Sequence, residues 1–218
     1  MAQILVFGDS VAWGAWDREG GWVARLRKYI DEKTLDTPEF CNTDFHQIYN
    51  LGISSVSGEN STDLLKRFES ETKPRVFGED EVVFIFEIGD NDSMFLKDKN
   101  AFAVPPEKFR KHLQKLIQTA KKYSSKIVFV GTAAVDESRT APVPWDKNMF
   151  FKNEYIQKYS KIIKNACKKN KINFIEISET FMKANYKSLL EDGLHPNSEG
   201  HKIIFETVKN FLVKEKII

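Results

Sequence analysis

Short runs of hydrophobic residues alternate with longer amphipathic segments along the whole chain. The runs are nearly continuous rather than alternating polar with apolar, which is typical of parallel strands buried on both faces. They predict strands at Gln3–Phe7, Gln47–Leu51, Val82–Ile88, Lys126–Gly131 and Asn173–Ile177. The amphipathic segments predict helices at about Gly21–Glu32, Ser61–Glu71, Pro106–Tyr123, Asn153–Asn170 and Ser198–Lys214.

Two of these helices also carry start signals. Pro105 and Pro106 open the third helix, where the missing N–H of proline costs little, and Asn197 or Ser198 is placed to cap the last one. Strands that alternate with helices imply a parallel sheet with helices on both faces. We find no internal repeat, low-complexity tract or linker, so we expect residues 1–218 to form one domain.

Composition and charge narrow the functional classes. The 33 basic and 31 acidic residues leave a formal charge of +2, without the basic stripe expected of a nucleic-acid-binding protein. No apolar segment reaches the roughly 20 residues that a membrane span needs. The N-terminus runs straight into a short apolar segment without a basic region, and Cys41 and Cys167 match no metal-ligand spacing. We therefore expect a cytoplasmic protein with reduced thiols; its oligomeric state is not indicated.

Two candidate site segments follow the first two strands. After the first strand comes Gly8-Asp9-Ser10, where a sharp turn exposes the Ser10 hydroxyl and backbone N–H at the sheet edge. After the second comes Gly52, whose backbone N–H a ligand can approach closely. A serine or glycine in such a place is most often only a turn or cap residue, and we expect Asp9 to stabilise the turn rather than to act in catalysis.

A third segment, Gly89-Asp90-Asn91-Asp92, follows the third strand. The Asn91 amide could donate to an oxyanion that develops during acyl transfer. Turns rich in glycine, aspartate and asparagine are also common without function, and Asp92 is expected to stabilise the turn.

The fourth segment, Asp192-Gly193-Leu194-His195-Pro196, precedes the last helix. A serine hydroxyl needs a base to become a good nucleophile, and a neutral imidazole is suited to that task. Asp192 can accept a hydrogen bond from the ring of His195 and fix its tautomer, while Pro196 favours an extended His195. The remaining histidines, His46, His112 and His201, are expected to be surface or packing residues.

Taken together and in this order, the four segments resemble the blocks of the GDSL esterases, also called SGNH hydrolases. The resemblance extends from Ile4 to about Phe211. It implies an α/β fold, a three-layer α/β/α sandwich with a central five-stranded parallel sheet of the flavodoxin-like kind. It also implies a serine ester hydrolase that needs neither a cofactor nor a metal and acts on a small-molecule acyl ester. The implied catalytic residues are Ser10, Asp192 and His195, and the implied oxyanion hole consists of Ser10, Gly52 and Asn91.

Three features depart from this pattern or extend it. The loop Ile53–Gly58 is two residues longer than the family pattern, and Glu87 stands on the third strand where an apolar residue is expected. The stretch Thr132–Met149 follows the fourth strand without a clear period, so it is either a substrate wall or a surface excursion. Trp13 and Trp145 are candidate substrate-binding residues, and Trp16 could also line the pocket, although each could equally serve packing.

Other functions are compatible with the same residues. An acyltransferase or a sugar deacetylase would use the same serine, histidine and aspartate. A flavodoxin-like binding module would hold a phosphate at the strand ends without covalent chemistry, although Gly8 is the only glycine of its turn. A scaffold without activity is a further alternative. Metal-dependent hydrolysis is disfavoured because no histidines and carboxylates cluster in the sequence at ligand spacing.

Overall fold

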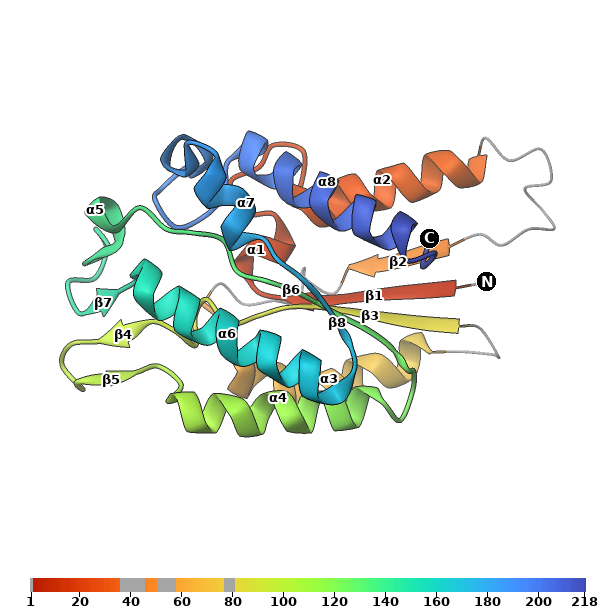
Figure 1. Ribbon diagram of the computed structural model, residues 1–218, viewed down its shortest axis with the longest axis horizontal. Helices are drawn as coiled ribbons and strands as arrows, with labels where there is room; N and C mark the ends of the chain where they lie inside the picture. Colours follow the sequence, from red (N-terminus) through yellow and green to blue (C-terminus); the bar gives the residue numbers. More distant parts are fainter. Residues whose placement is uncertain (1, 36–45, 51–57, 77–80) are drawn as a thin grey trace.

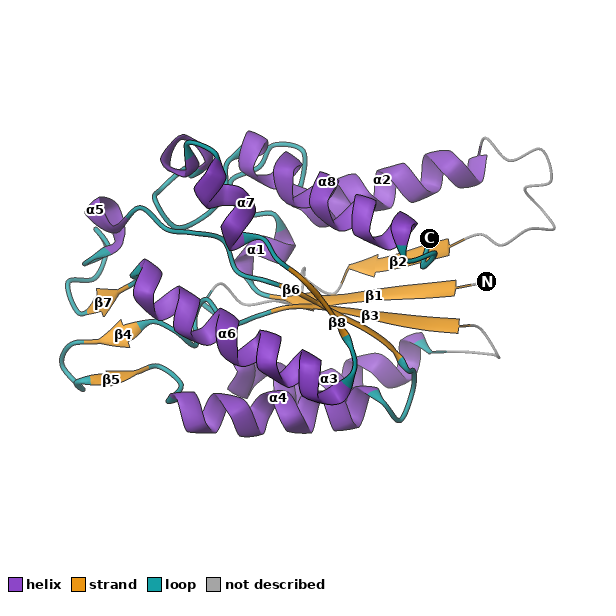
Figure 2. Ribbon diagram, in the orientation of Figure 1, coloured by secondary structure: helices purple, strands orange, loops and turns teal. Residues whose placement is uncertain are grey.

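A wholly parallel sheet forms the centre of the molecule. The computed structural model describes residues 2–35, 46–50, 58–76 and 81–218, without the side chains of Ala2, Thr34 and 46–50. The strands lie in the order β2-β1-β3-β6-β8 (Figures 1 and 2), and each begins and ends within two residues of its prediction. Their bounds are Ala2–Gly8 for β1, His46–Asn50 for β2, Glu81–Glu87 for β3, Lys126–Val130 for β6 and Asn173–Ile175 for β8.

Helices cover both faces of this sheet (Figure 1). One face carries α1 (Ser10–Trp13), α2 (Gly21–Leu35), α7 (Ser178–Lys183) and α8 (Ser198–Lys214). The other carries α3 (Ser61–Thr72), α4 (Pro106–Ala120) and α6 (Asn153–Asn170). Alternate residues of each strand enter the two cores: Val83 and Ile85 pack on the first face, and Phe84 and Phe86 on the second. The predicted three-layer α/β/α fold is confirmed.

The helix start signals act as expected. Pro106 is the first residue of α4, directly after Pro105. Of the two candidate caps for the last helix, Asn197 is the one used, and its side-chain oxygen accepts a hydrogen bond from the N–H of Gly200 at 3.1 Å. Each signal marks the residue at which its helix begins.

A second, antiparallel sheet of three very short strands was not predicted. It consists of β4 (Phe95–Leu96), β5 (Ala101–Phe102) and β7 (Met149–Phe150), in the order β5-β4-β7. The stretch 132–149 leads into it and contains the short helix α5 (Glu137–Thr140). Two 3₁₀ turns, Lys73–Arg75 and Tyr186–Leu189, complete the described elements. Strands of two residues are too short to give a hydrophobic alternation.

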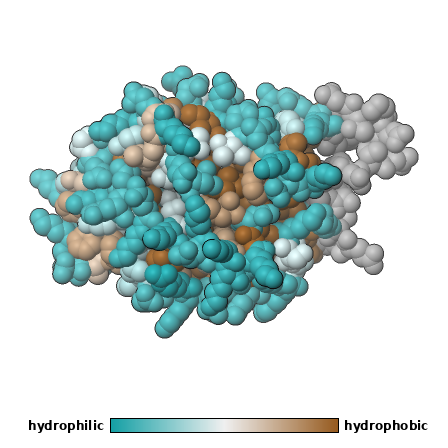
Figure 3. Space-filling model, viewed as in Figure 1, coloured by the Kyte–Doolittle hydropathy of each residue, from teal (hydrophilic) through white to brown (hydrophobic). Residues whose placement is uncertain are grey.

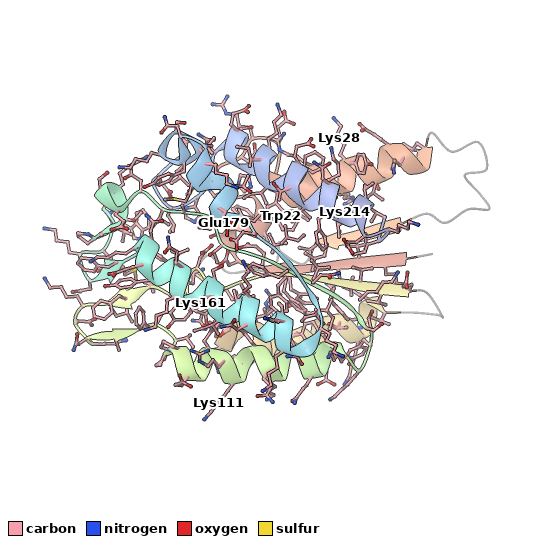
Figure 4. The ribbon with its side chains drawn as sticks, in the orientation of Figure 1. Trp22, Lys28, Lys111, Lys161, Glu179 and Lys214 are labelled. Atoms are coloured by element: carbon pink, nitrogen blue, oxygen red, sulfur yellow. The ribbon has the colours of Figure 1, made fainter. Side chains whose placement is uncertain are left out.

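The surface is polar on its outer helix faces. Figure 3 shows a mostly hydrophilic face, with hydrophobic residues visible between the helices. In Figure 4, Lys28, Lys111, Lys161 and Lys214 lie on the outer sides of α2, α4, α6 and α8, so these lysines are scattered rather than gathered in a stripe. None of the described helices has the length and apolar character that crossing a bilayer requires.

The structure describes one of the two cysteines. Cys167 is a free thiol on the buried face of α6, and burial raises its pKa to about 12. It is therefore the unreactive structural thiol that we expected. Cys41 lies outside the described residues.

The strand order places one crevice at the centre of the sheet. The chain goes from β1 outward to β2 and then returns to β3 on the other side of β1. In parallel sheets such a switch point leaves an open crevice at the carboxyl ends of the two central strands. The segments that follow β1 and β3 meet there, and these contain Ser10 and Asn91.

Candidate active site

Ser10 is the first residue of α1, immediately beyond β1. The Asp9 side chain caps this helix by accepting a hydrogen bond from the N–H of Val11 at 3.0 Å. Gly8 makes the tight turn possible, because a Cβ there would overlap the Cβ of Ala12 and lie 2.7 Å from the carbonyl oxygen of Glu87. The turn therefore holds Ser10 at the edge of the sheet, buried except for 7% of its surface.

His195 and Asp192 belong to one closed turn before α8. The N–H of Glu191 donates to the carbonyl of His195 at 2.9 Å, and Leu190 pairs with Pro196 across the base of the turn. Gly193 has a φ of +92°, a conformation that favours glycine. These contacts fix the geometry in which Asp192 faces the ring of His195.

The two ends of the chain meet at this point. The Oγ atom of Ser10 lies 3.0 Å from Nε2 of His195, and Nδ1 of the same ring lies 2.7 Å from Oδ2 of Asp192. When Nδ1 donates to Asp192, Nε2 is left to accept from the serine hydroxyl. The contact between Ser10 and His195 spans 185 positions of the sequence. The structure therefore brings together the three residues that the sequence singled out.

Asp192 is held in its ionised form. Burial alone raises the pKa of this carboxyl, but hydrogen bonds from the ring and backbone of His195 outweigh it, so the pKa lies well below its usual range. The backbone N–H groups of Leu194 and His195 donate to Oδ1 at 2.9 Å and 2.8 Å. An ionised carboxylate in this place stabilises an imidazolium when His195 takes up a proton.

Trp16 also touches this pair, and the sequence analysis gave it no such role. Its indole Nε1 lies 3.0 Å from Oδ2 of Asp192 and 3.2 Å from Nδ1 of His195. The ring stands edge-on to the imidazole, with centroids 6.1 Å apart and an interplanar angle of 89°. The contact depends on a left-handed backbone at Trp16, with a φ of +66°, which no local sequence pattern announces.

Asn91 follows β3 and faces Asp9 at the same edge. Its side-chain nitrogen Nδ2 donates to Oδ2 of Asp9 at 3.1 Å and to the carbonyl of Glu59 at 3.0 Å. An amide nitrogen carries two hydrogens, so both are engaged in this arrangement. Gly52, the other expected oxyanion-hole residue besides Ser10, lies outside the described residues.

A cluster of three buried carboxyls lies beneath this edge. One carboxyl oxygen from each of Asp9, Glu87 and Asp90 lies within 4.8 Å of the others. Asp9 is far from the other two carboxyls in the sequence and is brought next to them because β1 and β3 lie side by side, so ligand spacing in the sequence does not predict this cluster. A carboxyl oxygen of Glu87 accepts from the N–H of Ala12, which gives this unexpected strand residue a polar partner.

The surroundings of this cluster favour the protonated form of its carboxyls. Burial raises the pKa of Asp9 to about 6, and it raises the pKa values of Glu87 and Asp90 well above their usual range, with mutual repulsion adding to the effect. One oxygen of Glu87 and one of Asp90 have no hydrogen-bond partner among the described residues. Because the three carboxyls lie so close together, the protonation of each affects the pKa values of the others.

The remaining polar residues of these segments support the structure. Asp92 accepts from both the backbone N–H and the hydroxyl of Ser61 at the start of α3, and burial raises its pKa to about 7. His112 lies 2.8 Å from the Ser61 hydroxyl, and the buried His201 ring lies 3.2 Å from the carbonyl of Ala15. His112 and His201 are thus packing residues, as expected, while the side chain of His46 lies outside the described part.

The three tryptophans named in the sequence are exposed, and a groove lies beside one of them. Trp13 lies one turn after Ser10 on α1 and is 49% exposed, and Trp16 is 61% exposed. Trp145 is 58% exposed on the loop between α5 and β7, and its role in substrate binding stays a prediction. A groove beside Trp16 is lined by polar and charged residues, namely Arg18, Glu19, Glu191, Asn197, Ser198 and Glu199.

A hydroxyl, an imidazole and a carboxylate aligned in this way, at the switch point of a parallel sheet, define a serine ester hydrolase. The chain belongs to the GDSL-like lipase/acylhydrolase family, whose model matches residues 6–203. The resemblance noted in the sequence is therefore confirmed. No curated protein matches the sequence.

Solved structures share the fold over nearly the whole chain. A lipase/acylhydrolase from Enterococcus faecalis has a TM-score of 0.74 at 19% identity, covering 99% of this chain and 97% of its own. The acetyl xylan esterase AlAXEase has a TM-score of 0.71 at 22% identity, covering 96% and 99%. Axe2, an acetylxylan esterase from Geobacillus stearothermophilus, has a TM-score of 0.67 at 19% identity, covering 97% and 92%. At these identities the likeness concerns the fold.

Proposed function

We propose that this serine ester hydrolase, acting as one domain over residues 1–218 in the cytoplasm, cleaves small acyl esters or thioesters through an acyl-enzyme on Ser10. The observation that carries the proposal is the 3.0 Å contact between Oγ of Ser10 and Nε2 of His195. A contact across 185 positions requires the whole fold. It supplies the base that a serine nucleophile needs.

In the first half of the reaction, Oγ of Ser10 attacks the acyl carbon and His195 takes the hydroxyl proton on Nε2. Asp192 stabilises the imidazolium through its contact with Nδ1 at 2.7 Å. The carbon–oxygen bond to the alcohol then breaks, and His195 returns the proton to the leaving oxygen. In the second half, His195 removes a proton from water, which attacks the ester on Ser10 and releases the acid.

The oxyanion that forms during each attack needs donors. We assign them to the backbone N–H groups of Ser10 and Gly52 and to the Asn91 side-chain amide. Because both hydrogens of this amide are engaged, donation to substrate requires release of one bond. When Asp9 is protonated, its hydrogen bond with the Asn91 amide competes less strongly with the substrate for the N–H, since a neutral carboxyl attracts an N–H less than a carboxylate does.

A second candidate substrate class is an acetylated sugar. The groove beside Trp16 combines polar and charged side chains with apolar surface, and the exposed Trp13 and Trp16 are large aromatic side chains. Such a surface suits a ring with hydroxyls better than it suits a long acyl chain. Two of the structural neighbours are named as acetyl xylan esterases, which agrees with this candidate.

The test is a panel of nitrophenyl esters of increasing acyl length together with an acetylated xylo-oligosaccharide. We expect Ser10→Ala to lose hydrolysis of every substrate while it keeps the wild-type unfolding temperature. Addition of an alcohol acceptor distinguishes transfer from hydrolysis, because a transferase forms a new ester at the expense of free acid. Wild-type activity in Ser10→Ala would overturn the proposal, and no activity in the wild type would favour a binding function.

A further inference from the structure

The indole of Trp16 competes with the ring of His195 for one oxygen of Asp192. Nε1 lies within hydrogen-bond distance of both Oδ2 of Asp192 and Nδ1 of His195. An indole N–H can only donate, and Nδ1 must itself donate to Asp192 if Nε2 is to accept from Ser10. The two N–H groups therefore converge on the carboxylate oxygen, at 3.0 Å and 2.7 Å.

We propose that Trp16 is a positioning residue, whose indole N–H supplies the fourth donor to Asp192 and so sets how strongly this carboxylate supports His195. The inference rests on the proposed function, in which His195 is the base. Oδ1 already accepts from the backbone of its own turn, at 2.9 Å and 2.8 Å. Trp16 is the donor that comes from a different element, so it ties the turn before α8 to the segment after α1.

The backbone around Trp16 is held on both sides. The N–H of Ala15 donates to the carbonyl of Ser10 at 2.9 Å, and the buried His201 donates from Nε2 to the carbonyl of Ala15 at 3.2 Å. Asp17 accepts from the N–H of Gly21 at 3.1 Å and pairs with Arg25 at 3.0 Å. These contacts keep Trp16 in its left-handed conformation, which a non-glycine residue adopts only when its surroundings impose it.

The tryptophan has an inward edge and an outward face. Its N–H edge is turned to Asp192, although 61% of the residue is exposed. A tryptophan kept for packing alone would bury its rings, as Trp22 does with no exposed surface. A tryptophan side chain is largely apolar and has one polar group, the indole N–H, which usually finds a hydrogen-bond partner. The observed orientation therefore favours a role for the N–H.

A hydrogen bond to the carboxylate withdraws part of the charge that stabilises the imidazolium. Loss of this bond leaves more negative charge facing His195, so the ring retains its proton to higher pH and is less available as a base. The titratable groups that face His195 are Asp192 in its own turn, Asp9 before α1 and His201 on α8. A substitution at Trp16 leaves all three in place.

The experiment is the pH profile of kcat/KM for a nitrophenyl ester, measured for the wild type and for Trp16→Phe. We expect the acid limb of Trp16→Phe to move to higher pH by about half a unit, with kcat reduced more than KM is changed. Trp22→Phe is the matched control, because it removes a buried indole N–H that has no partner among the described residues. Its acid limb is expected to coincide with that of the wild type.

A second variant separates the N–H from the shape of the ring. Incorporation of 3-benzothienylalanine at position 16 keeps the bicyclic ring and replaces the N–H by sulfur, and it should move the acid limb as Trp16→Phe does. An unchanged acid limb in this variant would overturn the inference. If that result is found while Ser10→Ala is inactive, the proposed function stands and only the role of Trp16 is lost. If Ser10→Ala is active, the proposed function itself is contradicted.

Discussion

Asn91 donates its side-chain amide to the carboxyl of Asp9, with Nδ2 and Oδ2 3.1 Å apart. The residue after β3 is thereby tied to the residue that caps the helix of Ser10. The same amide donates to the carbonyl of Glu59 at 3.0 Å, which fixes its plane. The pair places the proposed oxyanion donor beside the proposed nucleophile at the switch point of the sheet.

The first prediction concerns this donor. Asn91→Ala should lower kcat for nitrophenyl acetate about a hundred- to a thousandfold, as removal of one oxyanion donor does in other acyl-transfer enzymes. Asn165→Ala makes the same chemical change at an exposed position of α6 and serves as the control. A kcat for Asn91→Ala within threefold of the control would exclude Asn91 from the oxyanion hole.

The second prediction follows from the buried carboxyl cluster. The pKa of Glu87 is raised by burial and by repulsion from Asp9 and Asp90. Between its ordinary pKa and the raised one, the folded protein binds more protons than the unfolded chain, so the free energy of unfolding falls as pH rises. Glu87→Gln removes this titration and should gain stability over the wild type as pH increases from 5 to 8.

The expected gain at pH 8 is about 1–3 kcal/mol, the usual cost of a buried group that lacks a partner. It is measured as the difference in unfolding free energy from urea titrations at each pH. Glu107→Gln, at a side chain of α4 that is 83% exposed, is the control and should show no such trend. If the unfolding free energies of Glu87→Gln and the wild type differ by the same amount at every pH, the raised pKa of Glu87 is contradicted.

The third prediction concerns the turn that carries Asp192 and His195. A Cβ at Gly193 would lie 2.7 Å from the Cβ of Arg139, and its φ of +92° is unfavourable for alanine. Gly193→Ala should therefore shift the turn and reduce kcat about tenfold or more, because small displacements of catalytic groups are costly. Unfolding free energy should fall by about 1–3 kcal/mol for the backbone strain, with a further loss from the clash.

Gly58→Ala isolates the strain from the clash. Gly58 has a φ of +87°, and a Cβ there would meet no atom of the described residues within 4 Å. Its loss of unfolding free energy should be clearly smaller than that of Gly193→Ala. Equal losses in the two variants would show that the contact with Arg139 is of no consequence.

Much of the fold was predictable because its signals are local. In the main sheet, β1, β3 and β6 are nearly continuous buried runs, and the long helices have an amphipathic period; Asn153–Asn170 and Ser198–Lys214 match their predicted bounds. The short helix α1 was not among the predicted helices, since four residues are too few to show a period. The small antiparallel sheet was missed for the same reason.

The site residues likewise divide into those with a local sequence signal and those without one. Ser10 and Asn91 stand out because they lie beside turn residues after a strand, and Asp192 and His195 because they lie in a turn before the last helix. The contacts of Glu87 and Trp16 have no such signal. Glu87 meets Asp9 only because β1 and β3 are neighbours, and Trp16 reaches Asp192 through a left-handed backbone. Both depend on tertiary structure that a sequence pattern does not encode.

The most direct test of the central claim is intact-mass and peptide mass spectrometry after treatment with a fluorophosphonate. We predict a single adduct on the peptide that contains Ser10, no adduct in Ser10→Ala, and labelling of His195→Ala that is slower by several orders of magnitude. An adduct of equal yield in Ser10→Ala, or one located on a different residue of the wild type, would contradict the account.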